Sequence, residues 1–225
     1  MEYEDKEIFI PGPCGRIHAK YFKNMQQGAP IALVLQPHPQ YGGTMNNRIV
    51  YETYNSFYKN GFSVIRINFR GVEKSDGIFD NGQGELSDAA AALDWIEKEN
   101  PGFGQCWVAG FSFGAWVAMQ LLMRRPEIDF FISVSPPADT KDFSFLAPCP
   151  SSGLLIHGDK DEISSHDTTR ILSEKLQKLK RIKVEFKSIK GADHFYINYM
   201  DQLVKNLDNY IKNSTNNKSG TLKSN

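Results

Sequence analysis

Three polar residues in this sequence have the types needed for nucleophilic catalysis. Ser112 lies in the run GFSFG, Asp161 follows in HGDKDEIS, and His194 follows in GADHF. A serine hydroxyl is a weak nucleophile near neutral pH unless a base removes its proton, and an imidazole base needs a carboxylate to fix its tautomer. Together, three such residues would attack a carbonyl carbon and form an acyl-enzyme intermediate.

The glycines on either side of Ser112 suit a tight turn between a strand and a helix. The apolar run Cys106–Gly110 precedes the serine, and the helical pattern Gly114–Arg125 follows it. Such a turn forces the serine into strained backbone angles and tolerates only small neighbours. It would also place the hydroxyl near a helix N-terminus, whose N–H groups face developing negative charge. These five residues alone leave open a glycine-rich turn in which the serine only caps the helix.

The acid and the histidine also follow apolar runs that are typical of strands. An aspartate pair, Asp159 and Asp161, comes after Gly153–His157, and His194 comes after residues 183–189. Ligands bind at the carboxyl ends of the strands in open α/β sheets, so we expect these side chains and Ser112 to meet at one edge. Asp193 directly precedes the histidine and is expected to be a turn or surface residue.

The elements that must position these residues alternate along the chain. Strands are predicted at 7–11, 16–22, 31–36, 62–69, 106–110, 130–134, 153–157 and 183–189, and helices at 47–59, 85–99, 114–125, 166–180 and 196–212. This alternation indicates an α/β fold with a mainly parallel sheet of roughly eight strands, an antiparallel start and helices on both faces. We therefore expect a single domain over residues 1–212 and a disordered polar tail over residues 213–225.

Composition narrows the class of protein further. The 225 residues carry 26 Lys and Arg against 26 Asp and Glu, so no net charge attracts nucleic acid or an anionic membrane. The apolar runs fall short of the roughly 20 residues that a membrane span needs, and the charged start lacks a signal-peptide core. Three cysteines without a CxxC motif fit a reducing compartment. We expect a cytoplasmic protein that acts on a small molecule, with no nucleic-acid or membrane partner; a homo-oligomer is left open.

These motifs resemble the α/β-hydrolase superfamily over Ile31–Lys212. GFSFG is similar to its nucleophile elbow, HGDKDEIS to its acid-bearing segment, and GADHF to its histidine segment. The segment from Asn68 to Gly77 is similar to its D-x-R-G-x-G-x-S loop, with Glu73 where a glycine is usual. QPHPQYGGTMNN, FDNGQGE and PCPSSGLLIHGDKDE resemble a subgroup of small, lidless bacterial hydrolases related to dienelactone hydrolases, which themselves hold cysteine at the elbow.

The resemblance assigns roles to the three residues. Ser112 would be the nucleophile, His194 the general base and later acid, and Asp161, rather than Asp159, the acid that orients the histidine.

An oxyanion hole needs two N–H donors aimed at the tetrahedral oxygen. The first is expected from Phe113, directly after the nucleophile. The second should come from the loop after residues 31–36, where Pro39 has no N–H, so Gln40 and Tyr41 are both candidates. The side chains of Phe113 and Tyr41 are expected to reach the acyl site.

The connection from the strand near Phe130 to that near Leu154 is too short for a lid domain. Phe143 and Phe145 lie in it and are predicted to form an apolar wall of the substrate site. Two further histidines, His38 and His157, are expected to tie loops together rather than to bind metal.

The sequence therefore predicts a serine hydrolase of the carboxylesterase type, which cleaves short-chain or small aromatic esters without cofactor or metal. Three alternatives remain: an amidase or peptidase on the same triad, a thioesterase, and a non-catalytic ligand-binding scaffold.

Overall fold

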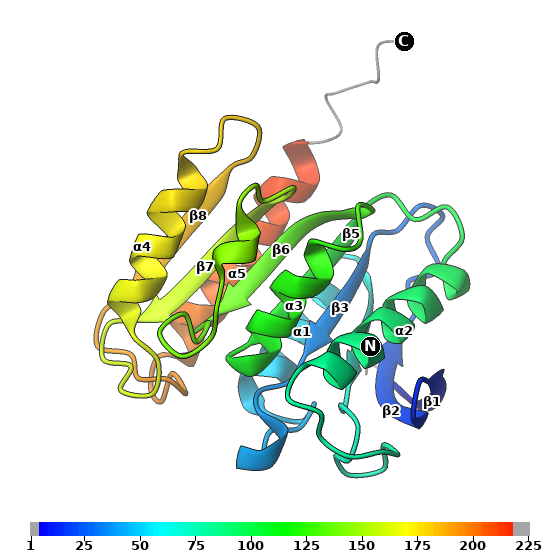
Figure 1. Ribbon diagram of the computed structural model, residues 1–225. Coiled ribbons are helices and arrows are strands. Elements are labelled where there is room, and N and C mark those ends of the chain that lie inside the picture. The colour runs from blue at the N-terminus through cyan, green and yellow to red at the C-terminus, as the bar shows by residue number, and fades with distance from the viewer. Residues whose placement is uncertain (1–4, 218–225) are drawn as a thin grey trace.

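Eight strands form one sheet in the computed structural model, which describes residues 5–217 (Figure 1). The strands are β1 (Lys6–Gly12), β2 (Gly15–Phe22), β3 (Ile31–Leu35), β4 (Ser63–Ile67), β5 (Cys106–Phe111), β6 (Ile128–Val134), β7 (Ser152–Gly158) and β8 (Val184–Ile189). The helices are α1 (Arg48–Lys59), α2 (Gln83–Glu99), α3 (Phe113–Leu122), α4 (His166–Gln177) and α5 (Met200–Asn217), with short 3₁₀ turns η1 (Pro39–Tyr41) and η2 (Ser144–Leu146).

The strands lie in the order β1-β2-β4-β3-β5-β6-β7-β8. β2 pairs antiparallel with both β1 and β4, and all other pairs are parallel. Leu35, at the end of β3, is level with Ile67 on one side and Gly110 on the other. The carboxyl ends of the parallel strands therefore share one edge, where the loops that carry the predicted site residues begin.

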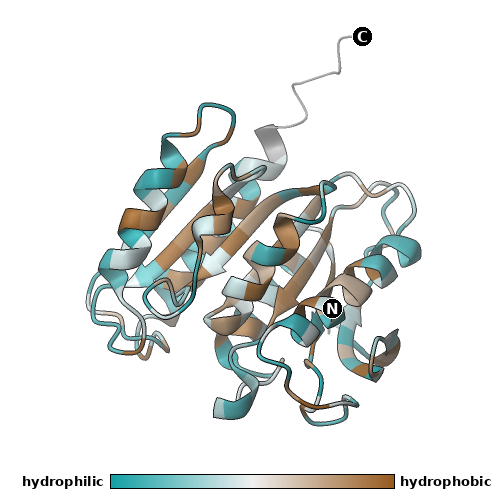
Figure 2. Ribbon diagram, viewed as in Figure 1, coloured by the Kyte–Doolittle hydropathy of each residue, from teal (hydrophilic) through white to brown (hydrophobic). Residues whose placement is uncertain are grey.

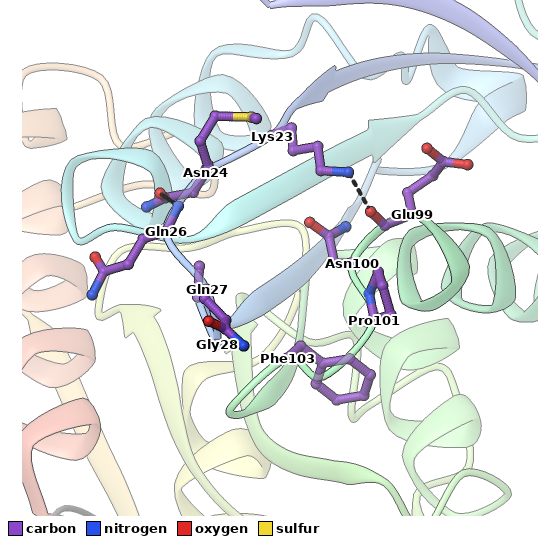
Figure 3. Close-up of a pocket in the computed structure, with 11 residues that line it drawn as sticks. Lys23, Asn24, Gln26, Gln27, Gly28, Glu99, Asn100, Pro101 and Phe103 are labelled. Atoms are coloured by element: carbon purple, nitrogen blue, oxygen red, sulfur yellow. Dashed lines mark hydrogen bonds between the residues drawn. The ribbon is translucent and has the colours of Figure 1, made fainter.

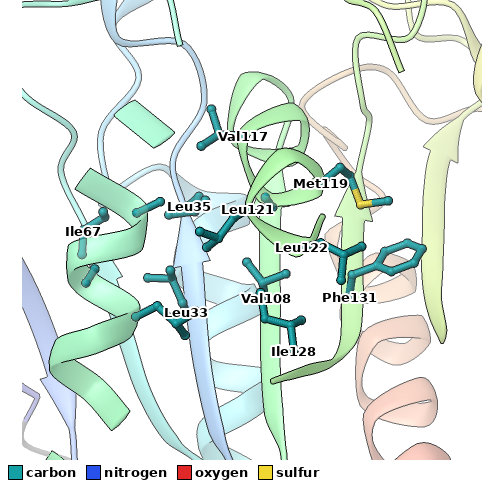
Figure 4. Close-up of a cluster of buried hydrophobic side chains, with 14 of the residues drawn as sticks. Leu33, Leu35, Ile67, Val108, Val117, Met119, Leu121, Leu122, Ile128 and Phe131 are labelled. Carbon is teal, nitrogen blue, oxygen red and sulfur yellow. The ribbon is translucent and has the colours of Figure 1, made fainter. Parts of the chain in front are cut away.

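Helices cover both faces of the sheet. α2, α3 and α4 pack on one face and α1 and α5 on the other, each group with its own buried apolar cluster (Figure 1). Figure 4 shows part of the first cluster, where β3, β5 and β6 meet α3. Every residue of β3, β4 and β5 is buried, and this burial explains the continuous apolar runs of β3 and β5, which are brown in Figure 2. No helix within residues 5–217 is long and apolar enough to cross a membrane.

The predicted strands and helices are all present, and most of their ends differ from the predicted ends by a few residues, as where α3 stops at Leu122 and α4 at Gln177. The last helix differs most. It begins at Met200 rather than at residue 196, because Tyr196 and Asn198 have φ angles of 55° and 64° and cannot continue a right-handed helix. It continues to Asn217, so residues 213–217 are helical although a disordered tail was expected there. The remainder of that predicted tail, residues 218–225, lies outside the described residues.

The connection between β6 and β7 is short. Residues 135–151 hold only the single turn η2, as the sequence predicted, so within the described chain no lid covers the carboxyl edge of the sheet. The turn η1, which follows β3 at the same edge, was not predicted.

Candidate active site

Ser112 occupies a strained turn between β5 and α3. Its backbone angles are φ 54° and ψ −118°, outside the regions that L-residues normally populate. Its N–H donates to the carbonyl of Val134 on β6, at 2.9 Å. A methyl group on Gly114 would lie 2.6 Å from the Leu35 carbonyl oxygen, and one on Gly110 would lie 2.6 Å from the Ala115 nitrogen. Only glycine fits at either flank, as the motif predicted.

The structure brings Ser112, His194 and Asp161 into one hydrogen-bonded line. Ser112 Oγ lies 3.1 Å from His194 Nε2, and His194 Nδ1 lies 2.7 Å from Asp161 Oδ2. Because a carboxylate can only accept, His194 carries its proton on Nδ1 and accepts the serine hydroxyl proton at Nε2. The imidazole is thus set to remove a proton from Ser112.

Asp161 accepts hydrogen bonds on both of its oxygens, and its side chain is fully buried. The N–H groups of Ile163 and Ser164 donate to Oδ1, each at 2.9 Å. Ser164 Oγ and His157 Nε2 reach Oδ2 at 3.2 and 3.0 Å, beside His194. Burial acts to raise the pKa of Asp161, but the hydrogen bonds from His157, His194 and the Ser164 backbone outweigh it and hold that pKa far below its usual value. The carboxylate therefore stays ionised despite its burial.

The two neighbouring aspartates point elsewhere. Asp159 Oδ1 accepts from the Gly191 N–H at 2.6 Å, and Asp193 Oδ1 accepts from the Ile197 N–H at 2.9 Å. Both carboxylates thus organise turns, and of the three acids only Asp161 bonds to the histidine within the described residues.

The predicted second oxyanion donors are already engaged. Gln40 N–H donates to His38 Nδ1 at 3.2 Å, and Tyr41 N–H donates to the His38 carbonyl at 3.1 Å, because residues 39–41 coil into the turn η1. In this structure, neither N–H group is therefore free to donate to an oxyanion. Of the two side chains, that of Phe113 is buried in the core and that of Tyr41 is 86% exposed.

The backbone N–H groups of Phe113, directly after Ser112, and of His38, in the loop after β3, make no hydrogen bond within residues 5–217. The His38 ring packs 4.8 Å from the Phe113 ring. Burial, and then the charge of Lys141, lower the pKa of His38, so its neutral Nδ1 can accept from Gln40. The sequence argument missed His38 because it treated that residue only as a side chain.

Gln36 also escaped the sequence argument. Its buried side chain donates to the Gly43 carbonyl at 2.6 Å and accepts from the Phe69 N–H at 2.8 Å. It thereby ties the loop after β3 to the loop after β4. A polar residue directly after an apolar strand was the signal that could have indicated this role.

The predicted apolar wall lies to one side of the triad. Phe143 is buried and stacks on Phe145 with ring centroids 6.0 Å apart. Phe143 lines a cavity of about 510 Å³ between residues 138–147 and α4, whereas Phe145 is not part of its lining and neither is any triad residue. The segment is held beside α3 by a 3.1 Å hydrogen bond from Trp116 Nε1 to the Asp142 carbonyl.

Within residues 5–217, the two buried thiols and a smaller cavity do not form a competing site. Cys106 and Cys149 are buried, which raises the pKa of both thiols and keeps them protonated. No group of three or more His, Cys, Asp or Glu within residues 5–217 could hold a metal ion. The cavity in Figure 3, about 150 Å³, lies beside Lys23 and Glu99, near the amino end of β3 and away from Ser112.

A serine on a strained strand–helix turn, served by a histidine and an acid from later strand ends of this sheet, defines an α/β hydrolase. Comparison with known families agrees and is more specific. A model of the X-Pro dipeptidyl-peptidase (S15 family) matches residues 15–221, and the chain belongs to this family.

Similar proteins extend over almost the whole chain. The uncharacterized protein RP471 of Rickettsia prowazekii is 50% identical over 91% of this chain and 88% of its own length. ATU1826, a putative alpha/beta hydrolase from Agrobacterium tumefaciens, is 49% identical with a TM-score of 0.92, over 94% of this chain and 97% of that one. An alpha-beta serine hydrolase homologue from Coxiella burnetii is 30% identical with a TM-score of 0.84, over 93% and 99%. The predicted superfamily is confirmed, and the relation to dienelactone hydrolases stays a prediction.

Proposed function

We propose that the protein is a serine hydrolase that cleaves carboxylic esters through an acyl-enzyme on Ser112. The observation that carries the proposal is the line from Ser112 Oγ through His194 to Asp161, at 3.1 and 2.7 Å. Ser112 attacks the acyl carbon while its proton passes to His194 Nε2, and Asp161 stabilises the imidazolium that forms. His194 then protonates the leaving alcohol, and water repeats the sequence to release the acid.

The N–H groups of Phe113 and His38 are proposed as the oxyanion hole. Both are free of partners within the described residues, and both lie where the loop after β3 meets the start of α3. The close approach of the Leu35 carbonyl to Gly114 shows how tightly these two segments pack. Developing negative charge at the attacked carbonyl would thus meet two fixed donors.

Short-chain or small aromatic acyl groups suit this edge. Residues 135–151 supply no lid that could enclose a long chain, and the cavity of about 510 Å³ at Phe143 is separate from the triad residues. Phe195, which is 48% exposed and packs edge-on against His194, offers a small apolar surface beside the nucleophile. A small acyl group could pack there without being enclosed.

The family match favours one second candidate, a peptidase that releases dipeptides ending in proline. The same triad would serve, because His194 can protonate an amine leaving group as well as an alcohol. The two candidates differ in substrate, so rates on a matched pair of substrates can separate them.

Labelling with a fluorophosphonate probe tests the serine mechanism first. Wild-type protein should be labelled, and the Ser112→Ala and His194→Ala variants should not. Next, p-nitrophenyl acetate and butyrate are compared with an Xaa-Pro p-nitroanilide. Higher kcat/KM on the esters supports the esterase, and higher kcat/KM on the dipeptide substrate replaces it with the peptidase. An unlabelled wild type that is inactive on both kinds of substrate would overturn the proposal.

A proline substitution isolates the His38 N–H. His38 has φ −57°, within the range that proline adopts, so His38→Pro removes the donor without requiring a new φ. His38→Ala removes the same ring but keeps the N–H and is the matched control. Loss of one oxyanion donor lowers kcat by about 100- to 1,000-fold, so kcat should fall that much further in His38→Pro than in His38→Ala. Equal kcat in the two variants would exclude this donor.

A further inference from the structure

His157, at the end of β7, is a buried histidine that the proposed reaction does not use directly. Its ring is fully buried, and Nε2 lies 3.0 Å from Asp161 Oδ2 and 3.1 Å from the Ser164 carbonyl oxygen. Ser164 Oγ lies 3.3 Å from the same nitrogen. Asp161 Oδ2 is therefore contacted by two imidazoles, His157 on one side and His194 on the other.

The contacts of His157 define its protonation. Two of the atoms around Nε2 can only accept, so Nε2 must carry a proton. Nδ1 is buried and has no hydrogen-bond partner among the described residues. A proton there would be a buried, unsatisfied donor on a charged ring, which is costly. His157 is therefore a neutral imidazole that donates from Nε2.

We propose that His157 is a positioning residue that holds the Asp161 carboxylate, as an anion, in the orientation that receives His194. The inference rests on the proposed function. When His194 takes the proton of Ser112, its positive charge must be met by a carboxylate that does not rotate and does not itself take the proton. A second donor on Oδ2 meets both needs, because it fixes the oxygen in place and makes it less basic.

No other titratable side chain described in the structure, apart from His194, donates a ring N–H to Asp161. The ring of His166, at the start of α4, lies 5.9 Å from that of His157, and its Nε2 bonds to Ser188 Oγ at 2.8 Å. The remaining charged or titratable neighbours of the network bond to other groups: Asp139 to the Ser165 N–H, Asp159 to the Gly191 N–H, Asp193 to the Ile197 N–H, and Tyr196 to Ser135. Within residues 5–217, His157 is thus the one side chain besides His194 that brings a ring N–H to Asp161.

Three variants test the proposal. His157→Leu removes the donor, and His157→Gln keeps an N–H donor on a side chain of similar reach. His166→Leu is the matched control, because the His166 ring packs against that of His157 but does not contact Asp161. The readouts are kcat and KM on p-nitrophenyl acetate, normalised to sites that react with the fluorophosphonate probe, and the pH profile of kcat/KM. Normalisation removes any loss that comes only from misfolded protein.

His157→Leu should lower kcat per labelled site by about 10- to 100-fold, the effect of losing one hydrogen bond to a charged group. KM should not change, because His157 does not touch substrate. The acid limb of kcat/KM should move to higher pH, since more of the Asp161 charge then favours protonated His194. His157→Gln should recover most of kcat and restore the acid limb, and His166→Leu should change neither.

An unchanged kcat per labelled site in His157→Leu, or no recovery in His157→Gln, would overturn the positioning role. A wild type that is neither labelled nor active would instead contradict the proposed function. In that case, or if the variants do not fold, ¹⁵N NMR of the imidazoles in the wild-type protein decides. A proton on His157 Nε2 supports the inference, and a proton on Nδ1 overturns it.

Discussion

Replacing Ser112 by glycine should stabilise the fold while it destroys the nucleophile. Ser112 holds φ 54° and ψ −118°, and a residue kept in such a region costs about 1–3 kcal/mol. The cost arises from clashes of Cβ with the backbone, so Ser112→Ala retains it and Ser112→Gly relieves it. Both variants lose the hydroxyl that faces His194, so their difference in stability isolates the backbone strain.

The magnitude follows from two opposing effects. Relief of strain contributes about 1–3 kcal/mol in favour of glycine. The greater freedom of glycine in the unfolded chain takes back about 0.4–1 kcal/mol. Ser112→Gly should therefore exceed Ser112→Ala by about 1 kcal/mol in free energy of unfolding, or roughly 2–4 °C in Tm for a chain of this length.

Urea denaturation followed by circular dichroism, together with Tm, measures the difference. Equal slopes against urea in the two variants would show that only stability has changed. Neither variant should react with the fluorophosphonate probe. If Ser112→Gly is no more stable than Ser112→Ala, the elbow is not strained in the way that its backbone angles indicate.

Three further predictions concern the groups that hold the site. Gly114→Ala should destabilise the protein by about 1–3 kcal/mol or more and abolish activity, because its methyl group meets the Leu35 carbonyl; urea denaturation and an ester assay check this. Asp161→Asn should lower kcat by about 10⁴-fold, as expected when an orienting acid is lost from such a triad. The depressed pKa of Asp161 stabilises the fold above the unfolded value of about 3.9, so the difference in unfolding free energy between wild type and Asp161→Asn should narrow as pH falls below about 4. Arg70→Met should lower the free energy of unfolding by about 3–5 kcal/mol, because it leaves the buried Asp88 carboxylate without the guanidinium that contacts it at 2.8 and 3.0 Å. The double variant with Asp88→Leu should regain stability in urea denaturation.

The order of strands and helices was predictable from sequence because it rests on local patterns. Fully buried strands have continuous apolar sequences, as in β3 and β5, and the glycines on either side of Ser112 indicate a tight turn. The start of α5 was not predictable in the same way. Tyr196 takes a left-handed conformation while its ring is fully buried and its hydroxyl lies 2.9 Å from Ser135 Oγ, a contact made by a residue distant in sequence. Tertiary packing there outweighs the helical pattern.

The same distinction holds at the site. Ser112, His194 and Asp161 were recognisable because their side-chain types define the chemistry. The free N–H of His38 was not, since a backbone donor carries no signal in its residue type and depends on how residues 39–41 coil. Glu73 is a further case: its φ of 48° explains why glycine is usual there in the resembled family. Its carboxylate accepts from Asn68 Nδ2 at 2.7 Å, a contact that glycine could not make.

Both ends of the Ser112–His194–Asp161 line are fixed before any substrate binds. At one end, the bond from the Ser112 N–H to Val134 and the close packing of Gly114 hold the serine through the parallel sheet. At the other, four donors besides His194 hold Asp161. His194 lies between two anchored partners, so little reorganisation is needed when the proton moves. Because an open edge supplies no lid to exclude water or to assemble the site on closure, this fixed geometry is what the proposed catalysis must rely on.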